Sequence, residues 1–337
     1  MSTLKKILVN KDKSCKSVWF MRQAGRYLPE FREIRSQNQN FIKLCLNSEL
    51  SSELTLQPIK RFDLDSAIIF SDILITPYAL GQEVKFIKNQ GPELSEFNME
   101  RFLDNNENEF LKKLNPIYKA IELTRRNLDK KKSLIAFIGA PWTLMVYMLN
   151  LKNNKNQLNL NKLNKKNINI NIILKKLTKF LFLHIKNQIN AGADVVQIFD
   201  SWAGLIDDNN IKNYCYIPNA NIIEFCKKEK IPNICFPRGI KEKYKDFNNL
   251  VKSDGINLDY EVDPSWAKNN FGNICIQGGM DPNVLLEDEK IALEEMEKYL
   301  EVFKNNPYIF NLGHGILPET NPSIIKKIVD RVNIIKR

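Results

Sequence analysis

Residues 194–204 read DVVQIFDSWAG. The first part of this stretch is an almost unbroken apolar run, and polar and small residues follow it directly. Strands of a parallel sheet covered by helices on both faces have this near-continuous hydrophobicity, whereas antiparallel strands with one wet face alternate. The stretch therefore predicts a buried parallel strand that ends in a group of polar side chains.

Seven further runs have the same character. They are SVWF at 17–20, SAIIF at 66–70, LIAFIG at 134–139, NICFPRG at 233–239, GINLDY at 255–260, NICIQGG at 273–279 and YIFNLG at 308–313. Segments of helical character separate them, for example 107–128, 177–193 and 288–306. Eight such strand and helix units predict one (β/α)8 TIM barrel of class α/β over residues 1–337, and a doubly wound open sheet is the alternative fold.

Two segments interrupt the alternation. QEVKFIKNQGPEL at 82–94 predicts a small hairpin that turns at Asn89, Gln90 and Gly91. Residues 150–171 are low in complexity and rich in Asn and Lys, and they could form a helix of poor propensity or an extended surface loop.

The overall composition is that of a globular protein, with 43% hydrophobic and 26% charged residues. The formal net charge of +11 would suit nucleic acid, an anionic membrane surface or a polyanionic small molecule. Much of the excess is Lys scattered among Asn and Ile, as on an ordinary solvated surface. Because 150–171 also lacks aromatic residues and Arg, we expect no nucleic-acid partner.

The six cysteines form no C-x-x-C pair, so we expect reduced, mostly buried thiols and no metal site. The first 20 residues contain no apolar stretch long enough for a signal peptide. No later segment approaches the roughly 20 apolar residues of a membrane span. We therefore expect a cytoplasmic protein with no membrane partner.

The residues that follow each strand are the candidates for chemistry, because barrel active sites lie at the carboxyl ends of the strands. Arg22 and Arg26 share one turn with Gly25, and two guanidinium forks match the paired oxygens of carboxylates or phosphates. Asp72 directly follows the strand at 66–70, where a ligand with several N–H groups would satisfy its carboxylate. A helix N-cap is an equally good interpretation of Asp72.

Three further polar residues follow strands. His314 stands between two glycines and has room to donate or accept a hydrogen bond in a site, whereas His184 lies on an apolar helical stripe and is interpreted as structural. Tyr147 could be a site residue or a core aromatic. Ser201 could be a ligand contact or a helix N-cap.

Six strand-end segments together resemble the signature segments of the uroporphyrinogen decarboxylase family. In order, they are VWFMRQAGRYLPEF, IIFSDIL, GAPWTLMVYM, QIFDSWAG, QGGMDP and FNLGHGILPET. The resemblance runs from about Val18 to Thr320. It implies a single barrel, commonly a homodimer, that converts the four acetate side chains of uroporphyrinogen III to methyl groups without a metal or an organic cofactor. The product is coproporphyrinogen III, an intermediate of haem biosynthesis.

The resemblance also implies roles for individual residues. Asp72 matches the central aspartate that binds the pyrrole N–H groups, and it is expected to be catalytic together with Arg22, Tyr147 and His314. The expected substrate contacts are Arg22, Gln23, Ala24, Gly25, Arg26, Asp72, Tyr147, Ser201 and His314. The Asn- and Lys-rich stretch at 150–171 departs from the family pattern, which has a flexible, glycine-containing stretch there.

A corrinoid-linked methyltransferase on the same barrel is the alternative activity. It would need a zinc site built from His and Cys. Neither His184 nor His314 lies close to a Cys in the sequence, and the RQAGRY segment favours the decarboxylase.

Overall fold

The computed structural model describes residues 1–87, 91–154, 157–159 and 169–335. Its main sheet has eight strands in the order β1-β12-β11-β10-β9-β8-β5-β2, and all of its paired strands run parallel. Their bounds are β1 (Lys16–Val18), β2 (Ser66–Ile68), β5 (Ser133–Gly139), β8 (Val195–Asp200), β9 (Asn233–Pro237), β10 (Gly255–Leu258), β11 (Cys275–Gly278) and β12 (Tyr308–Phe310).

The two end strands of this order, β1 and β2, meet through Asp65. Its backbone N–H donates to the carbonyl of Val18 at 3.1 Å, and its side chain accepts from the Val18 N–H at 2.7 Å. The Asp65 side chain thus replaces part of the backbone hydrogen bonding between β1 and β2, and the sheet closes into a barrel. The predicted barrel is confirmed, and the open-sheet alternative is wrong.

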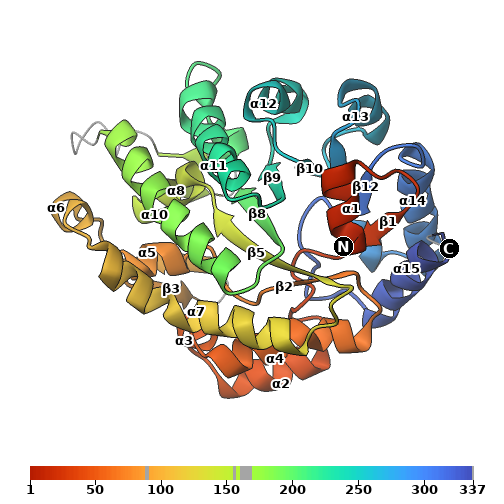
Figure 1. The fold of residues 1–337 in the computed structure, drawn as a ribbon, viewed down its shortest axis with the longest axis horizontal. Helices are drawn as coiled ribbons and strands as arrows, with labels where there is room; N and C mark the ends of the chain where they lie inside the picture. Colours follow the sequence, from red (N-terminus) through yellow and green to blue (C-terminus); the bar gives the residue numbers. More distant parts are fainter. Residues whose placement is uncertain (88–90, 155–156, 160–168, 336–337) are drawn as a thin grey trace.

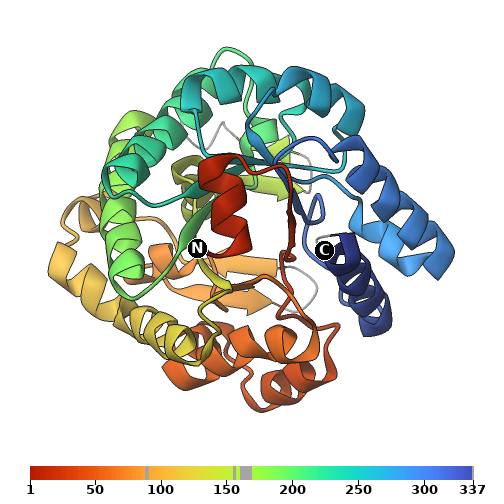
Figure 2. The same ribbon diagram turned by 45° about the vertical axis from the view of Figure 1, so that its right-hand side comes forward.

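Helices surround the sheet, as Figures 1 and 2 show. Their bounds are α1 (Thr3–Asn10), α2 (Pro29–Gln37), α3 (Phe41–Cys45), α4 (Ser48–Arg61), α5 (Ile75–Ala79), α6 (Met99–Leu103), α7 (Glu107–Asn127), α8 (Pro141–Met148), α10 (Ile170–Asn190), α11 (Ile217–Lys228), α12 (Tyr244–Val251), α13 (Pro264–Asn270), α14 (Glu289–Val302) and α15 (Pro322–Ile335). The three helices predicted by example are confirmed as α7, α10 and α14. Helix α10 begins earlier than predicted because Asn169 caps it by accepting the Ile172 N–H.

Helix α1 covers the amino ends of the strands, which the sequence analysis did not predict. Its Leu4, Ile7 and Leu8 are fully buried in a cluster with apolar side chains of the barrel. The Ser2 hydroxyl, just before the helix, hydrogen-bonds that of Ser133 at the start of β5 at 2.5 Å. Figure 2 shows α1 in the middle of the ring of helices. Since α1 occupies this end, we look for a site at the carboxyl ends of the strands.

Fully buried polar side chains fill part of the barrel interior. The indole N–H of Trp19 donates to Gln277 at 2.9 Å, and the Gln277 amide donates to Gln197 at 3.1 Å and to Asn257 at 2.5 Å. An unpaired buried polar group costs about 1–3 kcal/mol, and in this network the Gln197 amide nitrogen lacks a partner among the described residues. The network links β8, β10, β11 and the residue after β1 across the barrel.

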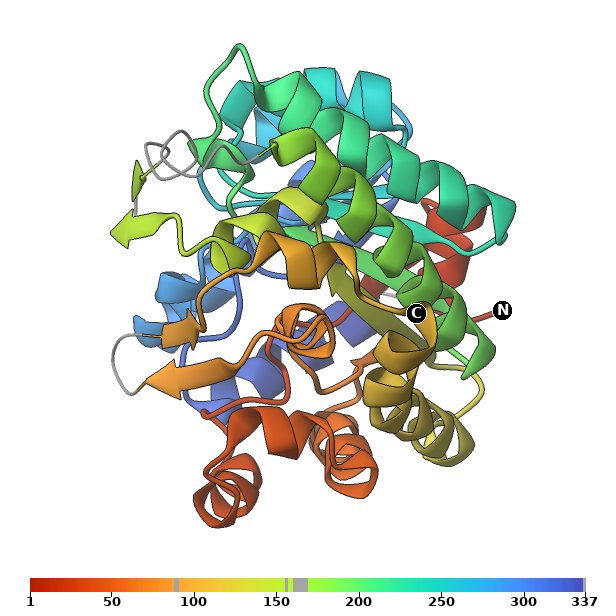
Figure 3. The ribbon, with the colours of Figure 1, turned by 90° about the vertical axis from the view of Figure 1, so that its left-hand side faces the viewer.

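Two small antiparallel sheets lie outside the barrel. The predicted hairpin is confirmed as β3 (Val84–Ile87) and β4 (Gly91–Leu94), although Asn89 and Gln90 lie outside the described residues. The described front part of 150–171 pairs β6 (Lys152–Asn154) with β7 (Gln157–Leu158), so neither a continuous helix nor an extended loop describes it. Figure 3 shows both sheets on the side of the molecule opposite α1.

Several expectations about single residues are confirmed. All six cysteines are free, and Cys15 is the one that is not buried. His184 is buried, and its Nδ1 lies 3.1 Å from the Tyr118 hydroxyl, so it is structural. Within the described ranges, the helices are too short or too polar to cross a membrane.

Candidate active site

The turn after β1 has little conformational freedom. Gln23 N–H donates to the Phe20 carbonyl at 3.1 Å, and Leu28 N–H donates to the Gly25 carbonyl at 2.9 Å. A Cβ on Gly25 would lie 2.6 Å from the Arg22 carbonyl oxygen, so a side chain does not fit there. Arg22 itself has a φ of 61°, in the left-handed region that non-glycine residues rarely occupy. Such strain is kept only where the surroundings hold it.

The Arg22 side chain lies against Gly315 in the loop after β12. A Cβ on Gly315 would lie 2.7 Å from Arg22 Cγ and closer still to Cδ. The two loops are joined where Ile316 N–H donates to the Met21 carbonyl at 3.0 Å. The second glycine beside His314 therefore leaves room for the Arg22 side chain.

Gln23, a predicted substrate contact, is fully buried and engaged in the fold. Its side chain accepts from Phe20 N–H at 3.1 Å and donates to the Ser66 carbonyl at 3.1 Å. Its own carbonyl accepts the Tyr27 hydroxyl at 3.0 Å. Each polar atom of Gln23 thus has a partner in the protein, so positioning of the turn fits this residue better than direct contact with a ligand.

Asp72 lies after β2, with one carboxylate oxygen engaged and the other open. Oδ1 accepts the Leu74 N–H at 2.8 Å. The N-cap interpretation is borne out in part: Ile75 N–H also donates to the Asp72 carbonyl at 3.3 Å, so Asp72 caps the turn that leads into α5, although the helix itself begins at Ile75. Within the described part of the chain, Oδ2 accepts no hydrogen bond. Burial raises the pKa of Asp72 to about 6, against the opposing effects of the Leu74 hydrogen bond and the Arg22 charge.

Charge interactions that involve Arg22 or His314 link six groups that follow strands, which places these groups in one neighbourhood. Loss of water around the guanidinium lowers the pKa of Arg22, although the residue remains partly exposed to solvent. The charges of Asp72 and Tyr147 oppose this shift, and those of Arg26 and Arg238 add to it. Burial and the charges of Arg22 and Arg238 lower the pKa of His314 to about 3. His314 is therefore a neutral imidazole at physiological pH.

Tyr147 is the one residue of α8 that is not fully buried. Its ring packs edge-on against Trp202 with the centroids 5.8 Å apart. Burial raises the pKa of the Tyr147 phenol, and the negative charge of Asp72 raises it further. Tyr147 is therefore partly exposed and also packs against the core, so its role as a site residue stays a prediction.

Buried polar groups hold Trp202 in place. The Thr143 hydroxyl donates to Asp200 Oδ1 at 2.7 Å and accepts the Trp202 N–H at 3.1 Å. The neighbouring Ser201 is half-buried. The N-cap alternative for Ser201 is wrong, because the following 3-10 turn η1 (Ala203–Leu205) has Trp202 at its N-cap.

Arg238 directly follows β9 and was not among the predicted site residues. It was included in the run NICFPRG, but its position directly after the last strand residue is the signal that identified Arg22, Asp72 and His314. Its charge lowers the pKa of both Arg22 and His314. The predicted residues Ala24, Gly25 and Arg26 complete the turn after β1, where Arg26 is exposed.

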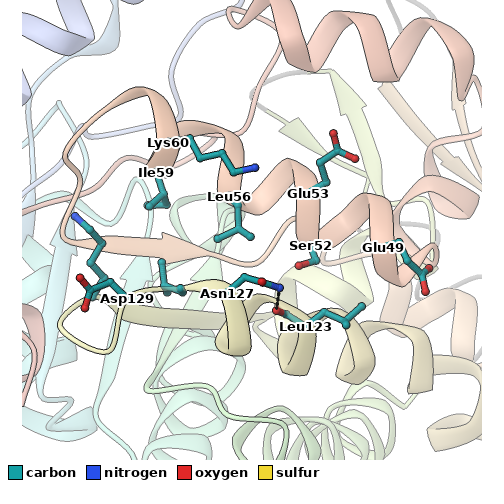
Figure 4. A pocket seen from close by; sticks show the side chains of 11 residues that line it. Glu49, Ser52, Glu53, Leu56, Ile59, Lys60, Leu123, Asn127 and Asp129 are labelled. Atoms are coloured by element: carbon teal, nitrogen blue, oxygen red, sulfur yellow. Dashed lines mark hydrogen bonds between the residues drawn. The ribbon is translucent and has the colours of Figure 1, made fainter.

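A separate surface cavity of about 520 Å³ lies between α4 and α7. Figure 4 shows it lined by Leu56, Lys60, Leu123 and Asp129, among others. It contains no predicted site residue, and its lining lies on α4, on α7 and in the loop that follows α7. We therefore do not assign the active site to this cavity. The described residues also contain no group of three His, Cys, Asp or Glu side chains placed to hold a metal ion.

Comparison with known proteins decides the family. The family model for uroporphyrinogen decarboxylase (URO-D) matches residues 2–334. The chain belongs to the uroporphyrinogen decarboxylase family. Relatives named uroporphyrinogen decarboxylase include one from Orientia tsutsugamushi (strain Ikeda), 40% identical over 98% of both chains. Another, from Wolbachia pipientis wMel, is 39% identical over 95% of this chain and 93% of the relative.

Solved structures support the barrel of this uroporphyrinogen decarboxylase family member. A methyltransferase from Methanosarcina mazei superposes over 100% of both chains with a TM-score of 0.76 and 15% sequence identity. At that identity the likeness shows the shared fold alone. The methyltransferase alternative therefore gains no support from it, whereas the family model and the relatives favour the decarboxylase.

Proposed function

We propose that this protein decarboxylates the four acetate side chains of uroporphyrinogen III and so produces coproporphyrinogen III for haem biosynthesis. Family membership supports the reaction class. The observation that carries the proposal is the Asp72 carboxylate, which has one open oxygen and lies in the field of Arg22. The Asp72 carboxylate can accept hydrogen bonds from the pyrrole N–H groups of the macrocycle, while arginines can donate hydrogen bonds to its carboxylates.

The chemistry requires a place for the electron pair that remains when CO2 leaves. Protonation of a pyrrole at its ring α-carbon makes the ring an iminium-like electron sink. The bond between the acetate CH2 and its carboxylate then breaks, and its electron pair forms an exocyclic double bond that neutralises the ring. Protonation of the methylene carbon and loss of the proton from the α-carbon give the methyl-substituted pyrrole. The substrate thus supplies the sink that a cofactor supplies in other decarboxylases.

In this scheme Asp72 stabilises the positive ring by preorganised electrostatics, an effect of about 3–4 kcal/mol for a single well-placed group. Arg22 and Arg26 bind substrate carboxylates. A guanidinium is a poor proton donor, since its pKa stays above about 12 in ordinary surroundings. Neutral His314, Tyr147 and Ser201 offer hydrogen bonds to substrate or to a water that delivers the proton.

Anaerobic incubation of the purified protein with uroporphyrinogen III tests the function directly. We expect intermediates with successively fewer carboxylates and, finally, the four-carboxylate product. Chromatography after oxidation to porphyrins resolves these species. Persistence of the eight-carboxylate substrate with a folded, pure protein would contradict the proposal.

The pH profile provides a second test. Asp72 must be ionised to stabilise a cation, and its pKa is raised from 3.8 to about 6. We therefore expect kcat/KM to fall tenfold per pH unit below about pH 6. Circular dichroism at each pH checks that the protein stays folded. A rate that stays level until the substrate carboxylates titrate, near pH 4 to 5, would show that Asp72 is not the controlling group.

The oligomeric state and location remain predictions. From the resemblance we infer a homodimer, which light scattering would show as twice the chain mass of 39.2 kDa. A monomer at assay concentrations would overturn that prediction. We infer the cytoplasmic location from the sequence, and cell fractionation tests it.

A further inference from the structure

The strand order places β9 opposite β1 in the barrel. In the order β1-β12-β11-β10-β9-β8-β5-β2, with β2 meeting β1 through Asp65, four steps separate β1 from β9 in either direction. Arg22 and Arg26 follow β1, and Arg238 follows β9. The two groups of arginines therefore stand on opposite sides of the barrel mouth.

The backbone of Arg238 is held by neighbouring strand ends. Its N–H donates to the Asp200 carbonyl at 3.1 Å, and its carbonyl accepts the Gly204 N–H at 2.9 Å. The two chain segments touch here, since a Cβ on Gly204 would lie 2.6 Å from the carbonyl carbon of Gly239. Gly239 N–H in turn donates to Asp259 after β10 at 2.6 Å. Because these hydrogen bonds fix the backbone of Arg238, its side chain is suited to precise binding.

The charge of Arg238 has no acidic partner in the described part of the chain. Other partly buried arginines do have one, such as Arg125, which binds Asp194 at 2.7 Å. Arg238 is half-buried, and the nearby charges that it acts on include Arg22, whose pKa it lowers. Arg238 thus has an unpaired positive charge at a half-buried position, and an anionic ligand would neutralise it.

We infer that Arg238 binds a carboxylate of the porphyrinogen from the side of the mouth opposite Arg22 and Arg26. The inference rests on the proposed function, because it takes that substrate as the ligand. The porphyrinogen carries carboxylates around its whole rim, so arginines on one side alone would leave the far side without a countercharge. Arg238 is thereby a substrate-binding residue that fixes the position of the macrocycle over Asp72.

Steady-state kinetics of Arg238→Gln with uroporphyrinogen III test this inference. We expect KM to rise about tenfold or more while kcat changes by less than about threefold, as for loss of one charge-assisted hydrogen bond. The KM of Arg238→Lys should lie between the two, because lysine keeps the charge and loses the fork. The KM of the wild type should also rise more steeply with added sodium chloride than that of Arg238→Gln.

Lys245→Gln is the matched control, since it removes one positive charge from an exposed position on nearby α12. We expect its KM and salt dependence to equal those of the wild type. An unchanged KM in Arg238→Gln, beside an active wild type, would overturn the inference alone. An inactive wild type would overturn the proposed function first. A loss of kcat and thermal stability in both Arg238 variants, with KM unchanged, would assign Arg238 a structural role and also overturn the inference.

Discussion

Asp72→Asn should reduce kcat by roughly 10²- to 10³-fold, because the neutral amide cannot stabilise the protonated pyrrole ring. The amide oxygen can still accept the Leu74 N–H, so the turn after β2 should survive. Product formation from uroporphyrinogen III, followed by chromatography, measures the effect. Activity close to that of the wild type would remove Asp72 from the mechanism.

Asp72→Asn should also leave the fold at least as stable as the wild type near neutral pH. The folded-state pKa of Asp72 is raised above its ordinary 3.8 to about 6, so the ionised carboxylate destabilises the folded state. This cost is fully present above about pH 6 and disappears as the pH falls toward 3.8. We therefore expect the difference in Tm between variant and wild type to be largest above about pH 6 and to shrink on acidification.

Asp281→Asn is the matched control for Asp72→Asn. Asp281 also follows a strand of the barrel, and its Oδ1 accepts a backbone N–H two residues later, that of Asn283 at 2.9 Å. The same chemical change is thus made in the same kind of turn. If Asp281→Asn lost as much turnover as Asp72→Asn, the loss would follow from removing any carboxylate at the barrel mouth, and the specific role of Asp72 would be contradicted.

The barrel strands were predictable because each is buried on both faces and therefore nearly continuous in hydrophobicity. Their ends were less so. The run at 17–20 predicts a strand through Phe20, but β1 ends at Val18, since Phe20 N–H bonds the Gln23 side chain instead of the ladder. Helix α1 was missed because its three buried side chains gain their partners only from residues far along the chain, such as Ile135 and Ile234.

The site residues that lie just after a barrel strand were predictable from that position alone. This rule placed Arg22, Asp72 and His314 at the same end of the barrel, and it would have included Arg238 if applied to the strand at 233–239. The sequence could not show that the Gln23 side chain turns inward to hold β1 beside β2, because that depends on the Ser66 carbonyl across the barrel seam. Nor could the sequence show that Gly313 packs against backbone whereas Gly315 packs against the Arg22 side chain.

Those two glycines should respond in opposite ways to substitution by alanine. The Gly315 backbone has an ordinary φ, so alanine is allowed there, but its Cβ would meet the Arg22 side chain at Cγ and Cδ. That side chain can move away, so Gly315→Ala should keep its Tm within a few degrees. The displaced guanidinium should weaken substrate binding by about 1–3 kcal/mol, which raises KM roughly 5- to 150-fold.

A Cβ on Gly313 would instead meet backbone, 2.8 Å from the carbonyl carbon of Asp259 and closer still to the Tyr260 nitrogen. Backbone cannot give way as a flexible side chain does, so Gly313→Ala should lower the unfolding free energy by about 1–3 kcal/mol, as overpacking does. Thermal unfolding and steady-state kinetics of both variants separate the two effects. A double-mutant cycle with Arg22→Ala should show that Gly315→Ala adds little once Arg22 is truncated. Full additivity in that cycle would mean that Gly315 acts on the substrate by a route other than Arg22.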